Sequence, residues 1–293
     1  MSEFDSLQRF LFEEAPVRGA VVALEDTWRQ VLSRHSYPPP VRTLLGELMA
    51  AAALLGANLK FDGSLILQMH GTGVLRLVVV ECSHDRTLRA TAKWDGVPGA
   101  TQTLQQLLGE GGRFVVTLEP KADKSQAWQG IVALEGDSVA AMLENYMRYS
   151  EQLDTRIILA ADTGRAAGLL LQRLPDGQGD PDGWNRAQSL AETLSATELL
   201  TLEPLQILHR LYHEETVRVF DAESVAFACT CSRERVGEML KMLGVQEASD
   251  ILLEQGSIEI GCDFCNQRYV FDEDEVNQLY QLDVMSSARL ARH

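Results

Sequence analysis

Four cysteines near the C-terminal end of the chain have the spacing of a metal site. Cys229 and Cys231 form a Cys-x-Cys pair. After thirty intervening residues, Cys262 and Cys265 form a Cys-x-x-Cys pair. Two short knuckles of this kind can close a tetrahedral thiolate cage around one ion, and zinc is the ion that such cages typically hold. The spacing therefore predicts one zinc ion per chain, bound by these four thiolates when the protein is reduced.

Two other interpretations of the cysteines have to be weighed. Structural disulfides would suit a small secreted protein, but no charged, apolar, small-residue leader precedes the first domain, so we expect the chain to stay in a reducing cytosol. An inert zinc knuckle is the commonest fate of a four-thiolate site, and spacing alone does not exclude it. Cys82 ends a predicted strand, and we expect it to be a free, partly buried thiol outside the site.

Each cysteine pair lies beside sequence that predicts a defined local structure. Ser232 directly follows the first pair and is a good helix N-cap, with apolar residues at helical spacing after it. The second pair lies between two alternating segments, 257–261 and 268–271, which predict a hairpin with the knuckle at its tip. Asp272 and Glu275 then have the spacing of a capping box at the start of a last helix.

The charge of the chain is strongly acidic. Asp and Glu number 42 against 26 Lys and Arg, which gives a formal net charge of −16. A surface this negative repels phosphate backbones, so we expect no nucleic-acid partner. Arg233 and Arg235 are too few for a basic stripe. They lie in the first turn of the helix after the first pair, where they would partly offset the charge of a zinc ion held by four thiolates.

The length and hydropathy of the chain fit a globular protein with more than one domain. At 293 residues, of which 45% are apolar, it is long enough for two domains and for a sizeable core. The longest apolar run, 48–57, is too short to span a bilayer, so we expect a soluble protein with no membrane partner.

Residues 1–174 predict an α+β domain of mostly antiparallel sheet packed with helices. Alternation predicts its strands and helical periodicity its helices. The predicted strands are 8–12, 17–24, 64–70, 74–82, 87–94, 113–118, 129–134, 156–161 and 167–172, and the predicted helices are 26–34, 41–60, 103–108 and 138–152. His70 and His84 lack partners for catalysis in this pattern, and the glycines at 71–73 and 109–112 do not lie between a strand and a helix. We therefore expect a protein that is not an enzyme.

A proline- and glycine-rich segment, 175–183, predicts a hinge loop after the first domain. Short helices follow it, at 184–193, 196–202 and 205–212. Short helices are marginal on their own, so this helical linker, residues 175–225, should depend on packing against its neighbours. It is the natural movable part of the chain, and it leads into the small four-cysteine zinc module at 226–293.

With these features in place, the chain resembles the redox-regulated heat-shock chaperones named for a mass of thirty-three kilodaltons. The two cysteine pairs match the switch of that family at every cysteine, with Ser232-Arg233 and Tyr269 in matching positions. Matches over the rest of the chain are Val-Arg-Gly at 17–19, Tyr-Pro at 37–38, Pro-Val at 40–41, Leu-Lys-Phe-Asp-Gly at 59–63, Leu-Glu-Gly-Asp at 134–137 and Ser-Glu-Gln at 150–152. Asn266 departs from the glycine that the family more often has, but asparagine tolerates a left-handed backbone.

The resemblance implies a holdase, a chaperone that binds unfolding proteins without ATP under oxidative and heat stress. It implies that zinc keeps the reduced protein inactive, and that oxidation pairs Cys229 with Cys231 and Cys262 with Cys265. It further implies a cytoplasmic protein that forms a homodimer when activated and hands its clients to an ATP-dependent foldase. Two alternatives stay open: a zinc-stabilised adaptor without redox response, and a thiol oxidoreductase, although a catalytic Cys-x-x-Cys normally opens a helix.

Geometry predicts an order for the two oxidations. In an extended Cys-x-Cys segment the α-carbons are roughly 6.6 to 7 Å apart, at the limit of the roughly 4.4 to 6.8 Å that a disulfide requires. The Cys-x-x-Cys turn already folds its two sulfurs together. We therefore expect Cys262 and Cys265 to pair first, and Cys229 and Cys231 to pair only after the module has loosened. The switch would then need an oxidant together with an unfolding condition such as heat.

Overall fold

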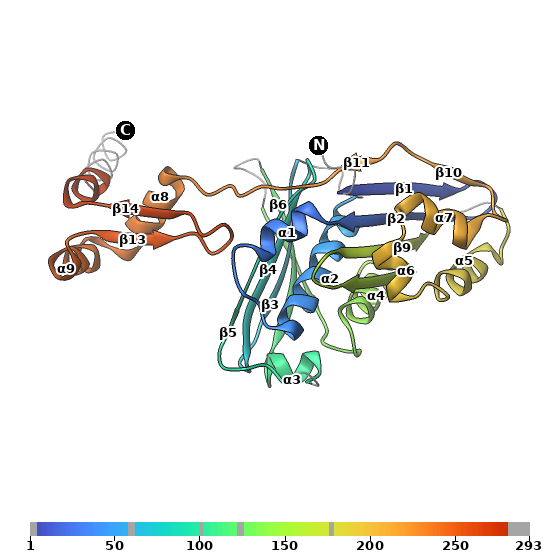
Figure 1. The fold of residues 1–293 in the computed structure, drawn as a ribbon, viewed down its shortest axis with the longest axis horizontal. Helices are drawn as coiled ribbons and strands as arrows, with labels where there is room; N and C mark the ends of the chain where they lie inside the picture. The colour runs from blue at the N-terminus through green and yellow to red at the C-terminus, as the bar shows by residue number, and fades with distance from the viewer. Residues whose placement is uncertain (1–4, 58–61, 100–101, 122–125, 176–178, 281–293) are drawn as a thin grey trace. The chain divides into compact units, whose positions relative to one another are not determined.

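The computed structural model describes residues 5–57, 62–99, 102–121, 126–175 and 179–280 (Figure 1). The chain divides into two compact units, Met1–Ala228 and Cys229–His293. All four clustered cysteines therefore belong to the second unit, and the described part of the predicted linker belongs to the first. The predicted α+β fold is confirmed, with mostly antiparallel sheets, packed helices and a C-terminal cysteine cluster.

Two six-stranded sheets form the frame of the first unit. The first sheet has the order β10-β1-β2-β9-β8, with β11 also pairing with β1. Its strands are β1 (Ser6–Phe12), β2 (Val17–Leu24), β8 (Thr155–Ala161), β9 (Ala166–Arg173), β10 (Val217–Val219) and β11 (Glu223–Ser224). Strands from the beginning and end of the predicted first domain are thus hydrogen-bonded neighbours, with Val21 opposite Leu169.

The second sheet has the order β12-β5-β4-β3-β6-β7. Its strands are β3 (Gly63–His70), β4 (Leu75–Ser83), β5 (Thr87–Trp94), β6 (Arg113–Pro120), β7 (Trp128–Val132) and β12 (Ala226–Phe227). β3, β4 and β5 form the predicted antiparallel meander. β12 adds to β5 in parallel, so the chain is hydrogen-bonded to this sheet directly before the first cysteine pair.

One helix, α2 (Pro39–Gly56), packs against both sheets and is buried along most of its length. Small residues make this possible, as predicted: a Cβ on Gly46 would come within 2.5 Å of the Ala161 Cβ. The other helices of the predicted first domain are α1 (Asp26–Leu32), α3 (Leu104–Leu108) and α4 (Val139–Tyr149). The predicted helix to residue 60 ends earlier, at Gly56, and residues 58–61, which include part of the matched 59–63 segment, lie outside the described chain.

The linker helices pack against the first sheet. They are α5 (Gly183–Ala191), α6 (Ala196–Thr201) and α7 (Pro204–Tyr212). Leu199 on α6 and Leu208 and Tyr212 on α7 are buried in one cluster with residues of β1, β2 and β9, and Figure 1 shows these helices beside those strands. The predicted capping box is present, because Ser195 and Glu198 each accept from the backbone N–H of the other. The short helices therefore pack against their neighbours, as the expected dependence requires; residues 176–178 of the predicted hinge lie outside the described chain.

The second unit is small. It consists of α8 (Arg233–Leu243), α9 (Val245–Gln255), the hairpin β13 (Ile258–Gly261) and β14 (Arg268–Phe271), and helical residues up to 280. The helix α9 was missing from our sequence interpretation. Gly244 ends α8 as predicted, but its φ of +88° lets the next helix begin at once.

Candidate metal centre

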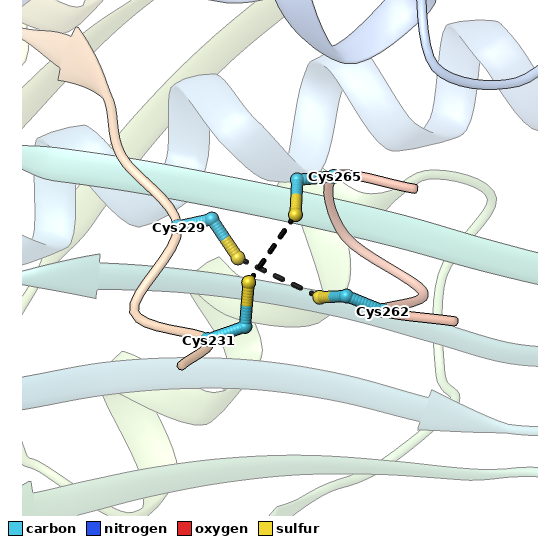
Figure 2. Close-up of side chains that lie close together, drawn as sticks. All are labelled: Cys229, Cys231, Cys262 and Cys265. Carbon is cyan, nitrogen blue, oxygen red and sulfur yellow. Dashed lines mark hydrogen bonds between the residues drawn. The ribbon is translucent and has the colours of Figure 1, made fainter. Parts of the chain in front are cut away.

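The sulfurs of Cys229, Cys231, Cys262 and Cys265 all lie within 4.8 Å of one another. Figure 2 shows the four side chains converging from two separate loops. The Sγ atoms of Cys229 and Cys262 are 3.6 Å apart, and those of Cys231 and Cys265 are 3.3 Å apart. A disulfide has its sulfurs about 2.05 Å apart, so all four are free thiols, each half-buried.

The first loop is held by the start of α8. Ser232 is the N-cap of this helix, and its hydroxyl accepts from the backbone N–H of Arg235, as the sequence predicts. The Arg235 guanidinium turns back and donates from Nη1 to the Thr230 carbonyl at 3.0 Å. Thr230 lies between the two cysteines, so the Cys-x-Cys segment is tied to the helix that follows it.

The second loop is the tip of the predicted hairpin, in which Gly261 pairs with Arg268. The Cys262 N–H donates to the Gln267 carbonyl at 2.9 Å, and the Asn266 N–H donates to the Cys262 carbonyl at 2.8 Å. Asn266 has a φ of +58°, the left-handed backbone that we expected asparagine to tolerate there. The turn therefore brings Cys262 and Cys265 to the same side of the hairpin tip.

Arg233 and the last helix tie α8 to the hairpin. The Arg233 guanidinium donates from Nη2 to the Val270 carbonyl at 2.6 Å and to Glu275 at 2.5 Å, and it lies over the Phe271 ring. Asp272 and Glu275 form the predicted capping box. These contacts fix the two loops relative to each other. From the sequence, we expected Arg233 mainly to offset the charge of the thiolates. In the structure its guanidinium instead contacts Val270, Phe271 and Glu275.

Tyr269 of β14 donates a hydrogen bond from its hydroxyl to the Cys231 sulfur at 3.2 Å. The same hydrogen bond raises the pKa of Tyr269 to about 12, so the hydroxyl keeps its proton and can donate. Burial acts to raise the pKa of Cys231, but hydrogen bonds from Tyr269 and the neighbouring thiols outweigh it and lower that pKa to about 7. From the sequence, Tyr269 was noted only as a position that matches the family. Nothing in the local pattern of its strand indicates that its hydroxyl contacts a cysteine of the other loop.

The four sulfurs fit a tetrahedral ion. With metal–sulfur distances of about 2.3 Å, the edges of a tetrahedral four-sulfur cage are roughly 3.8 Å long. The separations of 3.6 and 3.3 Å are close to that edge, and no pair exceeds 4.8 Å. Thiolates suit soft or borderline ions. The geometry and the donor set therefore permit one metal ion bound by all four predicted ligands.

Other residues considered from the sequence belong to the first unit and are not part of this cluster. Cys82 is fully buried in β4, where burial raises the pKa of its thiol to about 12, so it is less accessible than we predicted. His70 is exposed at the end of β3, and His84 Nδ1 lies 2.9 Å from Asp62 Oδ1 at the surface. Among the described residues, the cysteine cluster alone brings three or more metal-ligating groups together.

Fold and site together define an α+β protein that carries a separate, small module built around four free thiols. The family model described as "Hsp33 protein" matches residues 5–272. A "33 kDa chaperonin" of Chromobacterium violaceum is 64% identical over 293 residues, covering 100% of this chain and 99% of the relative. One from Neisseria meningitidis is 49% identical over 292 residues, covering 99% of this chain and 96% of the relative.

The chain belongs to the Hsp33 family, a family of chaperone proteins. A solved structure of the same fold, a 33 kDa chaperonin of Thermotoga maritima, has a TM-score of 0.83 at 22% identity and covers 96% of this chain and 99% of its own. Within the described residues, no helix combines the length and apolar character needed to cross a membrane.

Proposed function

We propose that this protein is a redox-regulated, ATP-independent holdase that is inactive when reduced and zinc-bound. The observation that carries the proposal is the convergence of four free thiols in a unit with little other core. Among the described residues of that unit, six apolar side chains are buried: Val236, Leu240, Ala248, Ile258, Phe271 and Val276. In a domain this small, a single apolar core rarely supplies more than about 3 to 5 kcal/mol of stability.

Cys229, Cys231, Cys262 and Cys265 would hold the zinc ion, one per chain. Bound structural zinc contributes on the order of 10 to 16 kcal/mol of folding free energy in small modules. Any chemistry that consumes these thiolates would therefore remove most of the stability of the second unit. Oxidation and unfolding of the module become one event.

The oxidation itself would convert four thiolates into two disulfides. One peroxide molecule oxidises two thiolates to one disulfide and leaves as two hydroxide ions, so two peroxides complete the switch. We propose the pairs Cys262–Cys265 and Cys229–Cys231, formed in that order. The hydrogen bond from Arg235 to Thr230 supports this order, because it holds the Cys-x-Cys backbone that would have to kink.

The linker supplies a surface that could bind clients after the switch. Helices α5, α6 and α7 bury apolar side chains against the first sheet, so their release would expose two apolar faces at once. One face carries Phe10 and Leu171, and the other carries Ile207 and Leu211. Contiguous apolar surface of this kind binds the exposed apolar segments of unfolding proteins.

An aggregation assay tests the proposal. A heat-unfolding test enzyme is followed by light scattering with zinc-loaded reduced protein, and again with protein treated with peroxide at raised temperature. We expect suppression only after oxidation, and loss of suppression when a dithiol and zinc are restored. A protein that gives the same light scattering in both redox states would contradict the proposal and favour the zinc-stabilised adaptor.

The thiol oxidoreductase is the weaker alternative. Its Cys-x-x-Cys would open a helix, whereas Cys262 and Cys265 here lie at the tip of the β13–β14 hairpin. Turnover of a dithiol substrate by catalytic amounts of protein would support the oxidoreductase alternative. Along with the holdase role we propose a cytoplasmic location, unfolding proteins as clients, a homodimer in the activated state and hand-over to an ATP-dependent foldase.

A further inference from the structure

We propose that Tyr269 is a positioning residue of the switch: its hydrogen bond shields the Cys231 sulfur and so directs the first oxidation to the second cysteine pair. This inference rests on the proposed redox function and adds a residue outside the four ligands. It concerns which sulfur reacts first, a property that the ligand set alone leaves open.

The position of Tyr269 is set by the fold of the second unit. The residue pairs with Ile260 across the hairpin, and both pack against the small core of the unit. This placement carries the ring across to the other cysteine loop, where the hydroxyl lies 3.2 Å from the Cys231 sulfur. The contact joins two segments 38 residues apart. Strand pairing therefore fixes the donor, while the cap of α8 fixes the acceptor.

The type of donor distinguishes Cys231 from the other three sulfurs. Among the described hydrogen bonds, the Tyr269 hydroxyl donates to the Cys231 sulfur and to no other sulfur. Two of the other sulfurs accept from backbone N–H groups instead: Cys229 from the N–H of Cys231, and Cys265 from the N–H of Gln267. Both sulfurs of the first pair therefore accept a hydrogen bond from outside the thiol cluster, and that of Cys231 comes from a side-chain hydroxyl that a mutation can remove.

A hydrogen bond slows attack on peroxide for two reasons. Oxidation begins when a sulfur lone pair attacks the O–O bond, forming a sulfenic acid and releasing hydroxide. A second thiolate then displaces hydroxide from that sulfur and closes the disulfide. A donated hydrogen bond stabilises the thiolate charge and occupies one direction of approach. When all four sulfurs are ligand thiolates, both effects leave the Cys231 sulfur less nucleophilic than it would be without Tyr269. This favours Cys262 and Cys265 as the pair that reacts first.

The test compares Tyr269→Phe with a matched control, Tyr280→Phe. Tyr280 belongs to the same unit, and its hydroxyl donates to the Leu240 carbonyl at 2.9 Å, away from the sulfurs. Full-length, zinc-loaded proteins are exposed to limiting peroxide, quenched at intervals, and mapped by mass spectrometry with dimedone as the probe for sulfenic acid. Zinc content before oxidation is measured on the same samples.

We expect Tyr269→Phe to bind one zinc and to show early oxidation at Cys231 raised about three- to tenfold, the size expected for removal of one charge-assisted hydrogen bond from the attacking group. Tyr280→Phe should match the parent. An unchanged site of first oxidation in Tyr269→Phe would overturn the inference. So would loss of zinc binding in Tyr269→Phe alone, because it would assign the residue a purely structural role. Neither result touches the holdase proposal, which fails only if oxidation leaves aggregation unchanged.

Discussion

The two units of the molecule are stabilised by different means. The first unit buries a cluster that extends from α2 into both sheets, and a second cluster under the linker helices. The described part of the second unit, up to residue 280, has six buried apolar residues, and its loops meet at four thiols. Apolar burial is insensitive to redox state, whereas thiolate ligation is not. This difference explains why the proposed redox switch would act first on the second unit and leave the two sheets of the first unit in place.

The largest expected effect is the loss of a zinc ligand. In Cys262→Ser, the second unit should lose zinc and unfold, because metal binding supplies on the order of 10 kcal/mol there. Residues of the first sheet should keep their amide protection. Hydrogen exchange resolved along the chain, together with metal analysis, checks both halves of this prediction.

Cys82→Ser is the control for that variant. Its thiol is buried in the core of the first unit and is not one of the four clustered thiols, so the protein should still bind one equivalent of zinc. Zinc loss in Cys82→Ser, or an intact second unit in Cys262→Ser, would break the distinction between the two units.

The next largest effect concerns the linker helices. They belong to the first unit, but we expect them to lose order when the second unit is oxidised. On oxidation, α5, α6 and α7 should lose amide protection next after the second unit and before α2. They are short, and their order depends on packing against the sheet. A time course of hydrogen exchange under peroxide and mild heat measures this. If chaperone activity developed while the amides of the three helices stayed protected, the proposal that oxidation of the second unit releases the linker would be wrong.

A core mutation in α7 should mimic part of that response without any oxidant. Leu208 is buried against the first sheet, and Leu208→Ala should weaken the packing of α7 by about 2 to 5 kcal/mol. We expect the reduced protein to keep one zinc and to suppress aggregation partially. Leu205→Ala is the matched control, because Leu205 is on the same helix but 58% exposed. Exposure of α7 in Leu208→Ala without any gain in suppression would show that clients bind elsewhere.

The sequence was most informative where the signal is local. The four ligands follow from cysteine spacing, and the caps at Ser232 and Asp272 follow from residues three positions apart. The strands β1 to β9 were predicted to within a few residues by alternation, whereas the short strands β10, β11 and β12 were not predicted. Each of these patterns, including each cysteine pair, consists of residues that are close together in the sequence.

What the sequence could not predict depends on distant pairing. The pairing of β2 with β9 joins residues more than a hundred positions apart, so the separation into two sheets left no trace in the local pattern. The contact of Tyr269 with Cys231 has the same character. The helix α9 was missed for a different reason: Gly244 is a stop for one helix and, through its positive φ, a start for the next.

The smallest expected effect compares one strained backbone position in each unit. Asn266 and Gln152 have similar φ angles of +58° and +57°, in the second and first unit respectively. A left-handed backbone costs most residues roughly 1 to 2 kcal/mol, but asparagine less. Glycine removes that cost but adds an entropic cost of folding of roughly 0.5 to 1 kcal/mol, because the unfolded chain is more flexible at glycine.

Gln152→Gly should therefore stabilise its unit by up to about 1 kcal/mol, whereas Asn266→Gly should leave zinc retention in denaturant almost unchanged. Denaturant titration followed by hydrogen exchange for the first unit, and by zinc release for the second, measures the pair. A marked loss of zinc retention in Asn266→Gly would mean that the Asn266 side chain, and not only its backbone angle, supports the knuckle.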